Sequence, residues 1–478
     1  MSGLEKSLTN GHTLAPKALG DVALSFSDES RDFLRELFQN LAESIQPSSR
    51  RWVEEETAFL AAHLGVPEAE QTRIAQRFPV WATNYVLVAL DAVLRSAPYQ
   101  LREVLDFGYG GRCTPTYRSV SVTPEESREV MQEGCYAVVV DNIPLAVSVA
   151  EKDCTDGSTR IAISVAVAVV HQELGRTLLK AVEAYPNFYR GQVITIDPSG
   201  MPEFQEVPEV ALDDVVLEPE LWSAIREQVL DFVDMQQAFR AARLPFRRGI
   251  ILAGPPGVGK TLVFRALTHR LRGRCSVLWL TARSIPEPPS VRRVFELARA
   301  LAPTLMLWED VDLTVRDRRA GNTAAVLGEL LAQLDGPASS DGVIACASTN
   351  DPSVLDEALS TRPSRFDRIV FVGLPSEGSR LRMLRRFVAD VPAVDADLAW
   401  VARETADLTG ADLREVVITA FAEAQREAGD SSAPAALETR HFRTALRQLA
   451  EANKAARRSG VRRGPTARRG QFGFSTAD

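Results

Sequence analysis

Cysteine and histidine are scarce in this sequence, whose 478 residues include five of each. The cysteines stand far apart, at positions 113, 135, 154, 275 and 346. Without closely spaced pairs they exclude a disulfide framework and a zinc ribbon, and the scattered histidines offer no metal cluster. Free thiols are typical of a reducing compartment, so the sequence predicts a cytoplasmic protein.

Long apolar runs are also missing. The most apolar stretch, residues 161–170, has ten residues, whereas a membrane-spanning helix needs about 20. The first residues, MSGLEKSLTNGH, lack the apolar segment of a signal peptide. These absences predict a protein without membrane insertion.

The composition is that of a soluble globular chain, with 45% hydrophobic and 25% charged residues. Its length predicts two to four domains. Residues 454–478 carry seven Lys or Arg and one Asp, a net charge of +6, which leaves −14 for the rest of a chain whose total is −8. The acidic body disfavours nucleic acid as a partner, because such binding depends on phosphate neutralisation. The basic tail predicts a disordered solubilising segment, or alternatively a docking strip for an acidic partner or nucleic acid.

The N-terminal region predicts two modules. Apolar spacing indicates a helical module over residues 1–120, with helices at 28–45, 52–64 and 81–94. Runs rich in Val, Ile and Ala then indicate an α/β module over residues 121–205. Its strands are expected at 136–140, 145–150, 161–170 and 193–196, and its helix at 172–184. Because it shows no catalytic constellation, we interpret it as a recognition or assembly module.

A phosphate-binding loop is the clearest motif. An apolar run at residues 248–253 predicts a buried strand, and GPPGVGKT at residues 254–261 follows it directly. A helical pattern comes next, so the motif stands in the strand–loop–helix context that it requires, unlike a chance glycine-rich turn. Loop amides and the helix N-terminus offer positive potential to phosphates. The predicted ATP-binding residues are Gly254, Pro255, Pro256, Gly257, Val258, Gly259, Lys260, Thr261 and Leu262.

Two of these residues have expected roles in the chemistry. Lys260 is expected to bridge the β- and γ-phosphates of ATP, and Thr261 to ligate Mg²⁺. Carboxylates follow a second predicted strand, TLMLW at residues 304–308, where Glu309, Asp310 and Asp312 stand. Because these acids lie where the strand leaves the core, we predict a catalytic carboxylate site, with a solvated charge cluster as the alternative.

Together these residues resemble the AAA+ ATPases, specifically the classic AAA clade, over roughly residues 210–450. Further segments carry the resemblance in the expected order, at residues 291–303, 327–336, 348–350, 360–368 and 408–413. The fold that the resemblance implies is α/β, a P-loop domain with a parallel sheet over residues 206–375. A helical lid is implied over residues 376–453, ahead of the basic tail at residues 454–478.

The resemblance also implies roles by position. Asn350 is expected to position the attacking water or to sense the γ-phosphate. Arg362 and Arg365 are expected to reach the ATP of a neighbouring subunit, where a cation stabilises the transferring phosphoryl group. Fingers supplied in trans imply a homo-oligomeric ring, usually a hexamer, although surface salt bridges are an alternative role for both arginines. An adenine pocket is implied at residues 213–216, which include Val215, and the sensor 2 region of the lid at residues 408–413 adds Gly410 and Ala411 to the predicted ATP-binding residues.

The acidic pair departs from the family's usual Asp-Glu order. In this register Glu309 takes the Mg²⁺ role and Asp310 the role of catalytic base, with a base one methylene shorter. The Glu-Asp-Val-Asp order resembles the subgroup around the mitochondrial chaperone Bcs1, as does the linker DDVVLEPELW at residues 213–222. The N-terminal membrane helix of that subgroup is absent here. Since the pair is functional in that subgroup, we predict an active ATPase.

The expected pore loop departs from the family as well. Threading unfoldases carry an aromatic–hydrophobic–Gly tripeptide there, whereas residues 281–290 (TARSIPEPPS) contain three prolines and no aromatic residue. Ile285 is its one sizeable apolar side chain. Because prolines restrict the backbone, this loop favours the movement of a folded partner, or an assembly switch, over threading.

The function that these features favour is an ATP-hydrolysing, chaperone-like ring. It would remodel or assemble a protein partner recruited through residues 1–205. Two alternatives stay open. One is a nucleic-acid-directed ATPase that uses the arginine-rich tail. The other is a nucleotide-binding scaffold with little turnover, suggested by the Glu309-Asp310 order.

Overall fold

The computed structural model describes residues 53–108, 111–153, 159–281, 284–285, 288–311, 329–330, 332–333, 341–351, 368–391, 393–429 and 434–458. The chain divides into two compact units. The first unit comprises Met1–Arg77, Ala89–Arg118 and Glu129–Tyr185, and the second unit comprises Phe78–Val88, Ser119–Arg128 and Pro186–Asp478. The phosphate-binding loop belongs to the second unit.

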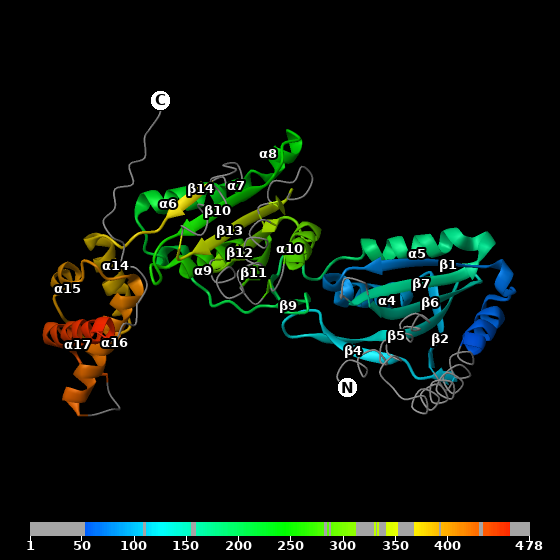
Figure 1. The fold of residues 1–478 in the computed structure, drawn as a ribbon, viewed down its shortest axis with the longest axis horizontal. Helices are drawn as coiled ribbons and strands as arrows, with labels where there is room; N and C mark the ends of the chain where they lie inside the picture. The colour runs from blue at the N-terminus through cyan, green and yellow to red at the C-terminus, as the bar shows by residue number, and fades with distance from the viewer. Residues whose placement is uncertain are drawn as a thin grey trace, which may run out of the picture. The chain divides into compact units, whose positions relative to one another are not determined.

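An antiparallel sheet forms most of the first unit (Figure 1). Its order is β1-β7-β6-β5-β2-β3, and β4 pairs with β5. The strands are β1 (Gln71–Phe78), β2 (Tyr99–Gly108), β3 (Gly111–Cys113), β4 (Thr116–Ser121), β5 (Ser127–Val140), β6 (Ile143–Asp153) and β7 (Thr159–Ala168). Asp141 and Asn142 connect β5 to β6 with φ angles of 50° and 67°. Two successive left-handed residues are what a two-residue hairpin loop needs, and Asp and Asn tolerate that backbone.

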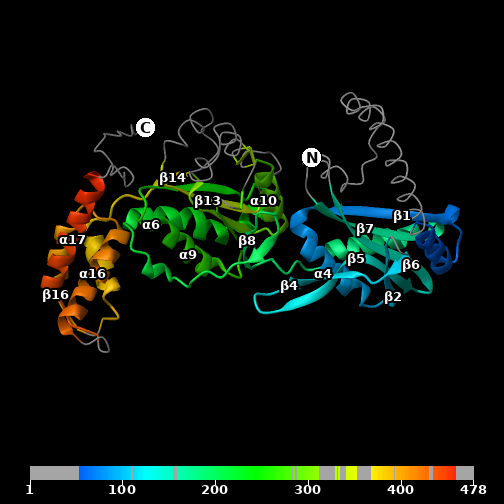
Figure 2. The same cartoon turned by 60° about the horizontal axis from the view of Figure 1, so that its bottom comes forward.

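Helices accompany this sheet. They are a helix over residues 53–64, α4 (Thr83–Leu94) and α5 (Gln172–Ala184), with short 3₁₀ turns η2 (Glu68–Glu70), η3 (Val80–Ala82) and η4 (Val169–His171). Figures 1 and 2 show α5 lying along the sheet beside β7. Leu178, Leu179 and Val182 of α5 are buried against it.

Residues 1–120 differ from the helical module that the sequence predicted. Within the described residues, helices occur near two predicted positions, but β1, β2, β3 and most of β4 lie in the same stretch. Side chains of β1 alternate between half-buried and more exposed, although the sequence there, QTRIAQRF, is mostly polar. Pairing with a distant strand, rather than local propensity, determines such a segment. The helix predicted at residues 28–45 lies outside the described residues.

A parallel sheet forms the centre of the second unit, as predicted. Its order is β14-β10-β13-β12-β11-β8-β9. The strands are β8 (Val193–Ile196), β9 (Pro202–Phe204), β10 (Arg248–Ala253), β11 (Ser276–Leu280), β12 (Thr304–Trp308), β13 (Val343–Thr349) and β14 (Arg368–Phe371). All neighbouring pairs are parallel except β8 and β9. Strands β10 to β13 are buried almost throughout, which explains their continuous apolar runs.

Helices precede and connect these strands. They are η5 (Leu212–Asp214), α6 (Pro219–Ile225), the π-helical η6 (Arg226–Asp231), α7 (Phe232–Asp234), α8 (Gln236–Ala241), α9 (Lys260–Leu271) and α10 (Pro288–Ala300). Phe264 and Leu267 of α9 pack with Leu252 and Ile344 in one core cluster. This packing fixes the start of α9 at the carboxyl ends of β10 and β13.

The edge of this sheet comes from the region predicted as the α/β module of residues 121–205. Strands β5, β6 and β7 belong to the antiparallel sheet, whereas β8 extends the parallel sheet by pairing with β11. Ile194 of β8 aligns with Leu278 of β11. The last and longest segment of the second unit therefore begins at Pro186, rather than near the predicted boundary at residue 205. The pairing joins segments more than 80 residues apart, so no local pattern indicates it.

The lid forms a helical bundle in the second unit. Its described helices are α14 (Glu377–Phe387), α15 (Leu398–Glu404), α16 (Gly410–Ala428) and α17 (Thr439–Arg458), with a short parallel pair β15 (Val394–Asp395) and β16 (Leu437–Glu438). Leu384, Val401, Leu413 and Phe442 are fully buried in its core. Helix α17 runs to Arg458, so the first residues of the predicted basic tail are helical, and residues 459–478 lie outside the described residues.

Membrane insertion was expected to be absent. Among the helices that the structure describes, none is both long enough and apolar enough to cross a bilayer.

Candidate active site

The phosphate-binding loop connects β10 to α9 at the carboxyl edge of the parallel sheet. Ala253 ends the strand, and Lys260 begins the helix. Gly259 precedes the helix with a φ of 103°, a backbone that residues with a Cβ rarely adopt. A Cβ on Gly254 would lie 2.1 Å from the carbonyl oxygen of Val372. The loop thus needs glycine at one position for its backbone angle and at another for close packing.

Lys260 is buried, with 6% of its surface exposed. Its Nζ donates to the carbonyl oxygens of Gly254 at 2.7 Å and Pro255 at 2.9 Å. It also donates to Oδ1 of Asn350 at 2.8 Å. A buried ammonium requires such acceptors, since desolvation without them is costly. The loop therefore folds around this cation and brings it to the end of β13.

Asn350 joins Lys260 to the acidic pair. Its Nδ2 donates to Oδ1 of Asp310 at 3.0 Å, while its Oδ1 accepts from Lys260. The backbone N–H of Asp310 donates to Oγ of Ser348 at 3.0 Å. Asp310 has a φ of 47°, in the left-handed region. The structure thus brings together three predicted site residues, from the loop and from the ends of two neighbouring strands.

Glu309 has a different partner. Its Oε2 accepts a hydrogen bond from Nε1 of Trp279 at 3.1 Å. Its backbone N–H donates to the carbonyl oxygen of Leu280 at 2.9 Å. The two neighbouring carboxylates are therefore held by different groups, Glu309 by β11 and Asp310 by Asn350. The sequence placed Glu309 in the site but gave no indication of Trp279.

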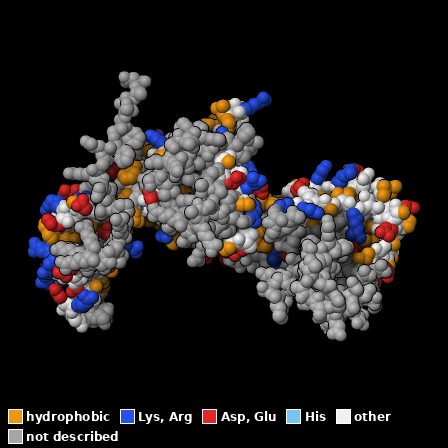
Figure 3. Space-filling model, in the orientation of Figure 1, with side chains coloured by type: hydrophobic (Ala, Val, Ile, Leu, Met, Phe, Trp, Pro, Cys, Tyr) orange, Lys and Arg blue, Asp and Glu red, His pale blue; other side chains and the backbone are white. Residues whose placement is uncertain are grey.

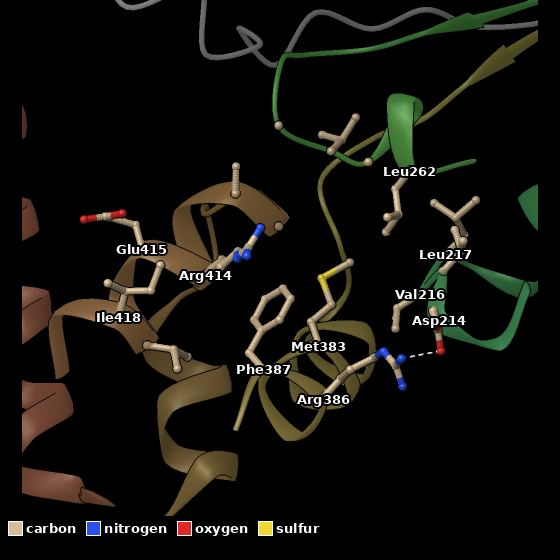
Figure 4. Close-up of a pocket in the computed structure, with 17 residues that line it drawn as sticks. Asp214, Val216, Leu217, Leu262, Met383, Arg386, Phe387, Arg414, Glu415 and Ile418 are labelled. Carbon is tan, nitrogen blue, oxygen red and sulfur yellow. Dashed lines mark ion pairs between the residues drawn. The ribbon is translucent and has the colours of Figure 1, made fainter. Parts of the chain in front are cut away.

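A cavity of about 760 Å³ lies between the loop, the linker and the lid. The predicted residues that line it are Val215, Gly257, Val258, Gly259, Leu262, Gly410 and Ala411. Figure 4 shows Leu262 and the linker on one side and the helices of the lid on the other. Pro255, Pro256, Lys260 and Thr261 are not among its lining residues. Asn350 and Asp310 do not line this cavity either, whereas Gly257, Val258 and Gly259 of the same loop do.

The lid adds lining residues that the sequence interpretation missed. Met383 and Phe387 come from α14, while Arg414 and Ile418 come from α16. In Figure 4 the Phe387 ring and the Met383 side chain project from α14 toward the middle of the cavity. Their spacing of four residues places both on one face of the helix. The sequence feature that could have identified Met383 and Phe387 is their apolar pairing four residues apart, on a different face of the helix from the core residue Leu384.

The linker and the lid are tied together beside this cavity. Arg386 forms an ion pair with Asp214, drawn in Figure 4. Glu218 Oε1 accepts from the backbone N–H of Ser376 at 3.0 Å and from Oγ of Ser379 at 2.8 Å. The first of these bonds is the largest reason why the pKa of Glu218 lies below its ordinary value. The backbone N–H of Ala411 also donates to the carbonyl oxygen of Gly257 at 3.0 Å.

The residues present suit a nucleotide with a small divalent cation. Thr261 is exposed in the first turn of α9, and Glu309 offers a carboxylate at a strand end. Both are oxygen donors, the type that Mg²⁺ prefers. No group of three or more His, Cys, Asp or Glu side chains suited to a metal occurs within the described residues. A cation here would therefore depend on phosphate oxygens for further ligands, as Mg²⁺ commonly does.

Other predicted residues lie outside the description. Arg362, Arg365 and Asp312 are among the residues that the structure leaves undescribed. The predicted pore loop is described in part. Ile285 is fully buried and Ser284 is 3% exposed, so the one sizeable apolar side chain of the loop faces the core rather than a substrate. Helix α10 starts at Pro288, so the last residues of the predicted pore loop belong to a helix.

Comparison with known proteins agrees with this geometry. Residues 250–374 match the ATPase family associated with various cellular activities (AAA). The chain is 36% identical over 271 residues to the ATP-dependent zinc metalloprotease FtsH 4 of Sphaerobacter thermophilus, covering 53% of this chain and 39% of that protein. It is 37% identical over 238 residues to an ATP-dependent zinc metalloprotease FtsH of Acidothermus cellulolyticus, covering 46% and 35%. Protein CdcH of Halobacterium salinarum is 30% identical over 271 residues, covering 55% and 36%.

These similarities are confined to one part of each protein. The chain spans between 35% and 39% of the length of these three relatives. The family match begins inside β10 and ends after β14, so it contains the loop, both carboxylates and Asn350. The chain therefore contains an AAA ATPase domain over residues 250–374, a type of domain that binds and hydrolyses ATP.

Proposed function

We propose that this chain forms an ATP-hydrolysing ring that remodels or assembles a protein partner recruited by its N-terminal region. The observation that carries the proposal is the hydrogen-bonded chain of Lys260, Asn350 and Asp310 inside an AAA domain. It joins a cation, a polar amide and a carboxylate at the carboxyl edge of a parallel sheet, where open α/β sheets bind their ligands.

Each residue has a distinct task in this proposal. Lys260 exchanges its bonds to the loop carbonyls for bonds to the β- and γ-phosphate oxygens. Asp310 accepts the proton of the attacking water, and Asn350 orients that water. Glu309 and Thr261 hold Mg²⁺, which when bound neutralises charge on the phosphates. The adenine occupies the cavity beside Val215.

The ring rests on the classic AAA resemblance. Arg362 and Arg365 stand in the signature of that clade, where they would reach the ATP of the neighbouring subunit. A site completed in trans couples turnover to assembly. The Glu309-Asp310 order and the linker at residues 213–222 support a position near the Bcs1 subgroup.

The action on a protein partner rests on two features. The relatives named above include ATP-dependent metalloproteases. Their similarity covers about half of this chain, so we infer from them ATP-driven work on proteins and not proteolysis. Residues 281–290, the loop that contacts the substrate in threading unfoldases, contain three prolines and no aromatic residue. Ile285, the one sizeable apolar side chain of the loop, is buried and does not offer a contact for an unfolded chain. We therefore favour movement of a folded partner, or switched assembly, over unfolding by threading.

The second candidate function is that of a nucleic-acid-directed ATPase, and the charge of this chain argues against it. The body of the chain is acidic, and the basic residues 459–478 lie outside the description. On the face drawn in Figure 3, Lys and Arg side chains of the lid are interspersed with Asp and Glu side chains. On that face, the described residues of the lid therefore form no continuous basic patch of the kind that phosphate binding needs. The cytoplasm is the compartment we propose, because the five cysteines stand far apart in the sequence, without the closely spaced pairs of a disulfide framework.

The test combines turnover, assembly and capture. Purified protein should release phosphate from ATP, and sedimentation should show a larger species when ATP is present. An Asp310→Asn variant, which binds but turns over slowly, should retain a partner in pull-downs with ATP, whereas Lys260→Ala should retain none. Absence of phosphate release from the assembled wild type would support the low-turnover scaffold instead. Loss of signal from a fluorescent substrate protein would show threading and overturn the favoured mode.

A further inference from the structure

Two tryptophans lie near the carboxyl ends of two neighbouring central strands, next to the acidic pair. Trp279 stands in β11 and Trp308 ends the neighbouring β12. Trp279 is 8% exposed and Trp308 is 2% exposed. The indole N–H of Trp279 donates to Oε2 of Glu309 at 3.1 Å. The indole N–H of Trp308 is buried and has no hydrogen-bond partner within the part of the chain that is described. One of two similar indoles is therefore engaged by the site, and the other is not.

Trp279 also contacts the helix that carries the other candidate magnesium ligand. Its ring meets Phe264 of α9 edge to face, with centroids 6.3 Å apart and an interplanar angle of 88°. Phe264 follows Thr261 by three residues, one helical turn along α9. A single buried indole thus packs on the helix of Thr261 and hydrogen-bonds Glu309.

Glutamate at this position has a particular need for such a partner. Its side chain has one more methylene and one more rotatable bond than the aspartate usual in the family. A carboxylate at the end of that longer chain loses more rotamer freedom when it is held in one orientation. A hydrogen bond to a charged group stabilises one orientation more strongly than a neutral pair does. The bond leaves Oε1 of Glu309 as the oxygen not occupied by Trp279.

We propose that Trp279 is a positioning residue, which holds the Glu309 carboxylate in the orientation that binds Mg²⁺. This inference rests on the magnesium role of Glu309 in the proposed function. Trp279 does not touch the nucleotide in this scheme and acts only through Glu309. It is the indole N–H, rather than the bulk of the ring, that performs the task.

The experiment measures binding rather than turnover. A fluorescent ADP analogue is titrated into full-length protein with excess Mg²⁺ and again with EDTA. The ratio of the two affinities measures how much Mg²⁺ strengthens binding of the analogue, and we call this ratio the gain due to Mg²⁺. Trp279→Phe keeps an aromatic ring and removes the N–H, so the gain should fall about tenfold, the scale of one hydrogen bond to a charged group. Affinity in EDTA should be unchanged. Trp308→Phe removes an indole N–H without a partner and should leave both affinities unchanged.

A second pair of variants tests whether Trp279 acts through Glu309. Glu309→Asp restores the shorter acid, whose carboxylate lies closer to the backbone and does not reach the indole in the same way. In that background, W279F should have no further effect on the gain due to Mg²⁺. Equal losses in both backgrounds would show that Trp279 acts elsewhere and would overturn the inference.

The outcomes separate this inference from the proposed function. A wild type that binds no ADP analogue, or binds it without any gain from Mg²⁺, would overturn the proposed function. A clear gain that is the same in wild type and in W279F would overturn the role of Trp279 alone. If W279F melts well below wild type, site-specific replacement of Trp279 by benzothienylalanine, which has the same shape and no N–H, provides the same comparison.

Discussion

Replacing Asp310 by asparagine should remove the catalytic base and keep the architecture of the site. Oδ1 of Asp310 accepts from Nδ2 of Asn350 at 3.0 Å. The amide oxygen of the substituted side chain can accept the same bond. Asparagine also tolerates the left-handed φ of 47° at least as well as aspartate. Asp310 does not line the cavity beside the linker, so the adenine site should be unaffected.

The expected loss is therefore one of rate and not of binding. A positioned general base contributes about 10² to 10⁴ in rate. Asp310→Asn should accordingly lower kcat at least about a hundredfold, which corresponds to about 2.7 kcal/mol or more in activation free energy. Affinity for ATP should remain at the wild-type level, because Lys260 and the loop are intact.

The assay pairs phosphate release with calorimetric titration of ATP. Asp341→Asn serves as a control for the same substitution elsewhere in the unit. The carboxylate of Asp341 accepts from the backbone N–H of Phe246, and an amide oxygen can replace it there too. The control should keep its turnover. Near-normal turnover in Asp310→Asn would mean that another group activates the water, and loss of ATP binding would mean that Asp310 holds the nucleotide site itself.

Three further predictions concern Lys260, Arg365 and Cys135. Lys260→Ala should abolish ATP binding while its melting temperature without nucleotide stays near that of wild type, because the substitution also removes a buried ammonium that is costly to desolvate; unchanged ATP affinity by calorimetry would contradict this. Subunits with Arg365→Ala, mixed with subunits carrying Asp310→Asn, should recover activity that neither shows alone, since some interfaces then pair two intact residues; inactivity despite confirmed co-assembly would contradict a finger in trans. Burial raises the pKa of the Cys135 thiol to about 11, so a thiol reagent should leave Cys135 unmodified in the native protein up to about pH 9 and modify it after denaturation; mass spectrometry of the labelled peptide in both states measures this, and modification of native Cys135 would contradict it.

The parts of the site that could be predicted from the sequence are those encoded over short distances. The loop at residues 254–261 is read from a contiguous motif, and strands β10 and β12 have the bounds that their apolar runs predicted. Parallel strands buried on both faces are recognisable because they are apolar at every position. The resemblance implied that Asn350 positions the attacking water or senses the γ-phosphate, and the structure brings its side chain into contact with Asp310.

The parts that could not be predicted depend on partners distant in sequence. Strand β1 has the composition of an exposed helix and becomes a strand by pairing with β7. Strand β8 joins the ATPase sheet through β11, which no local pattern of residues indicates. In the sequence, Trp279 is indistinguishable from the other apolar residues of its strand. Only the structure shows that its N–H donates to Glu309, 30 positions later in the chain. Ile285 reads as a loop side chain available to a substrate, yet it is fully buried.

The contacts around the cavity explain how events at the nucleotide would reach the lid. The backbone of the phosphate loop and the start of α16 share a hydrogen bond, from Ala411 to the carbonyl of Gly257. The linker is tied to α14 through Glu218 and through the ion pair of Asp214 with Arg386. Since loop, linker and lid each line the cavity, a change in its occupancy must act on all three attachments together. The exposed ion pair contributes little energy by itself, about 1 kcal/mol or less. The linker should therefore follow the lid mainly through its hydrogen bonds, those of Glu218 with Ser376 and Ser379 and that of Arg382 with the carbonyl oxygen of Leu217.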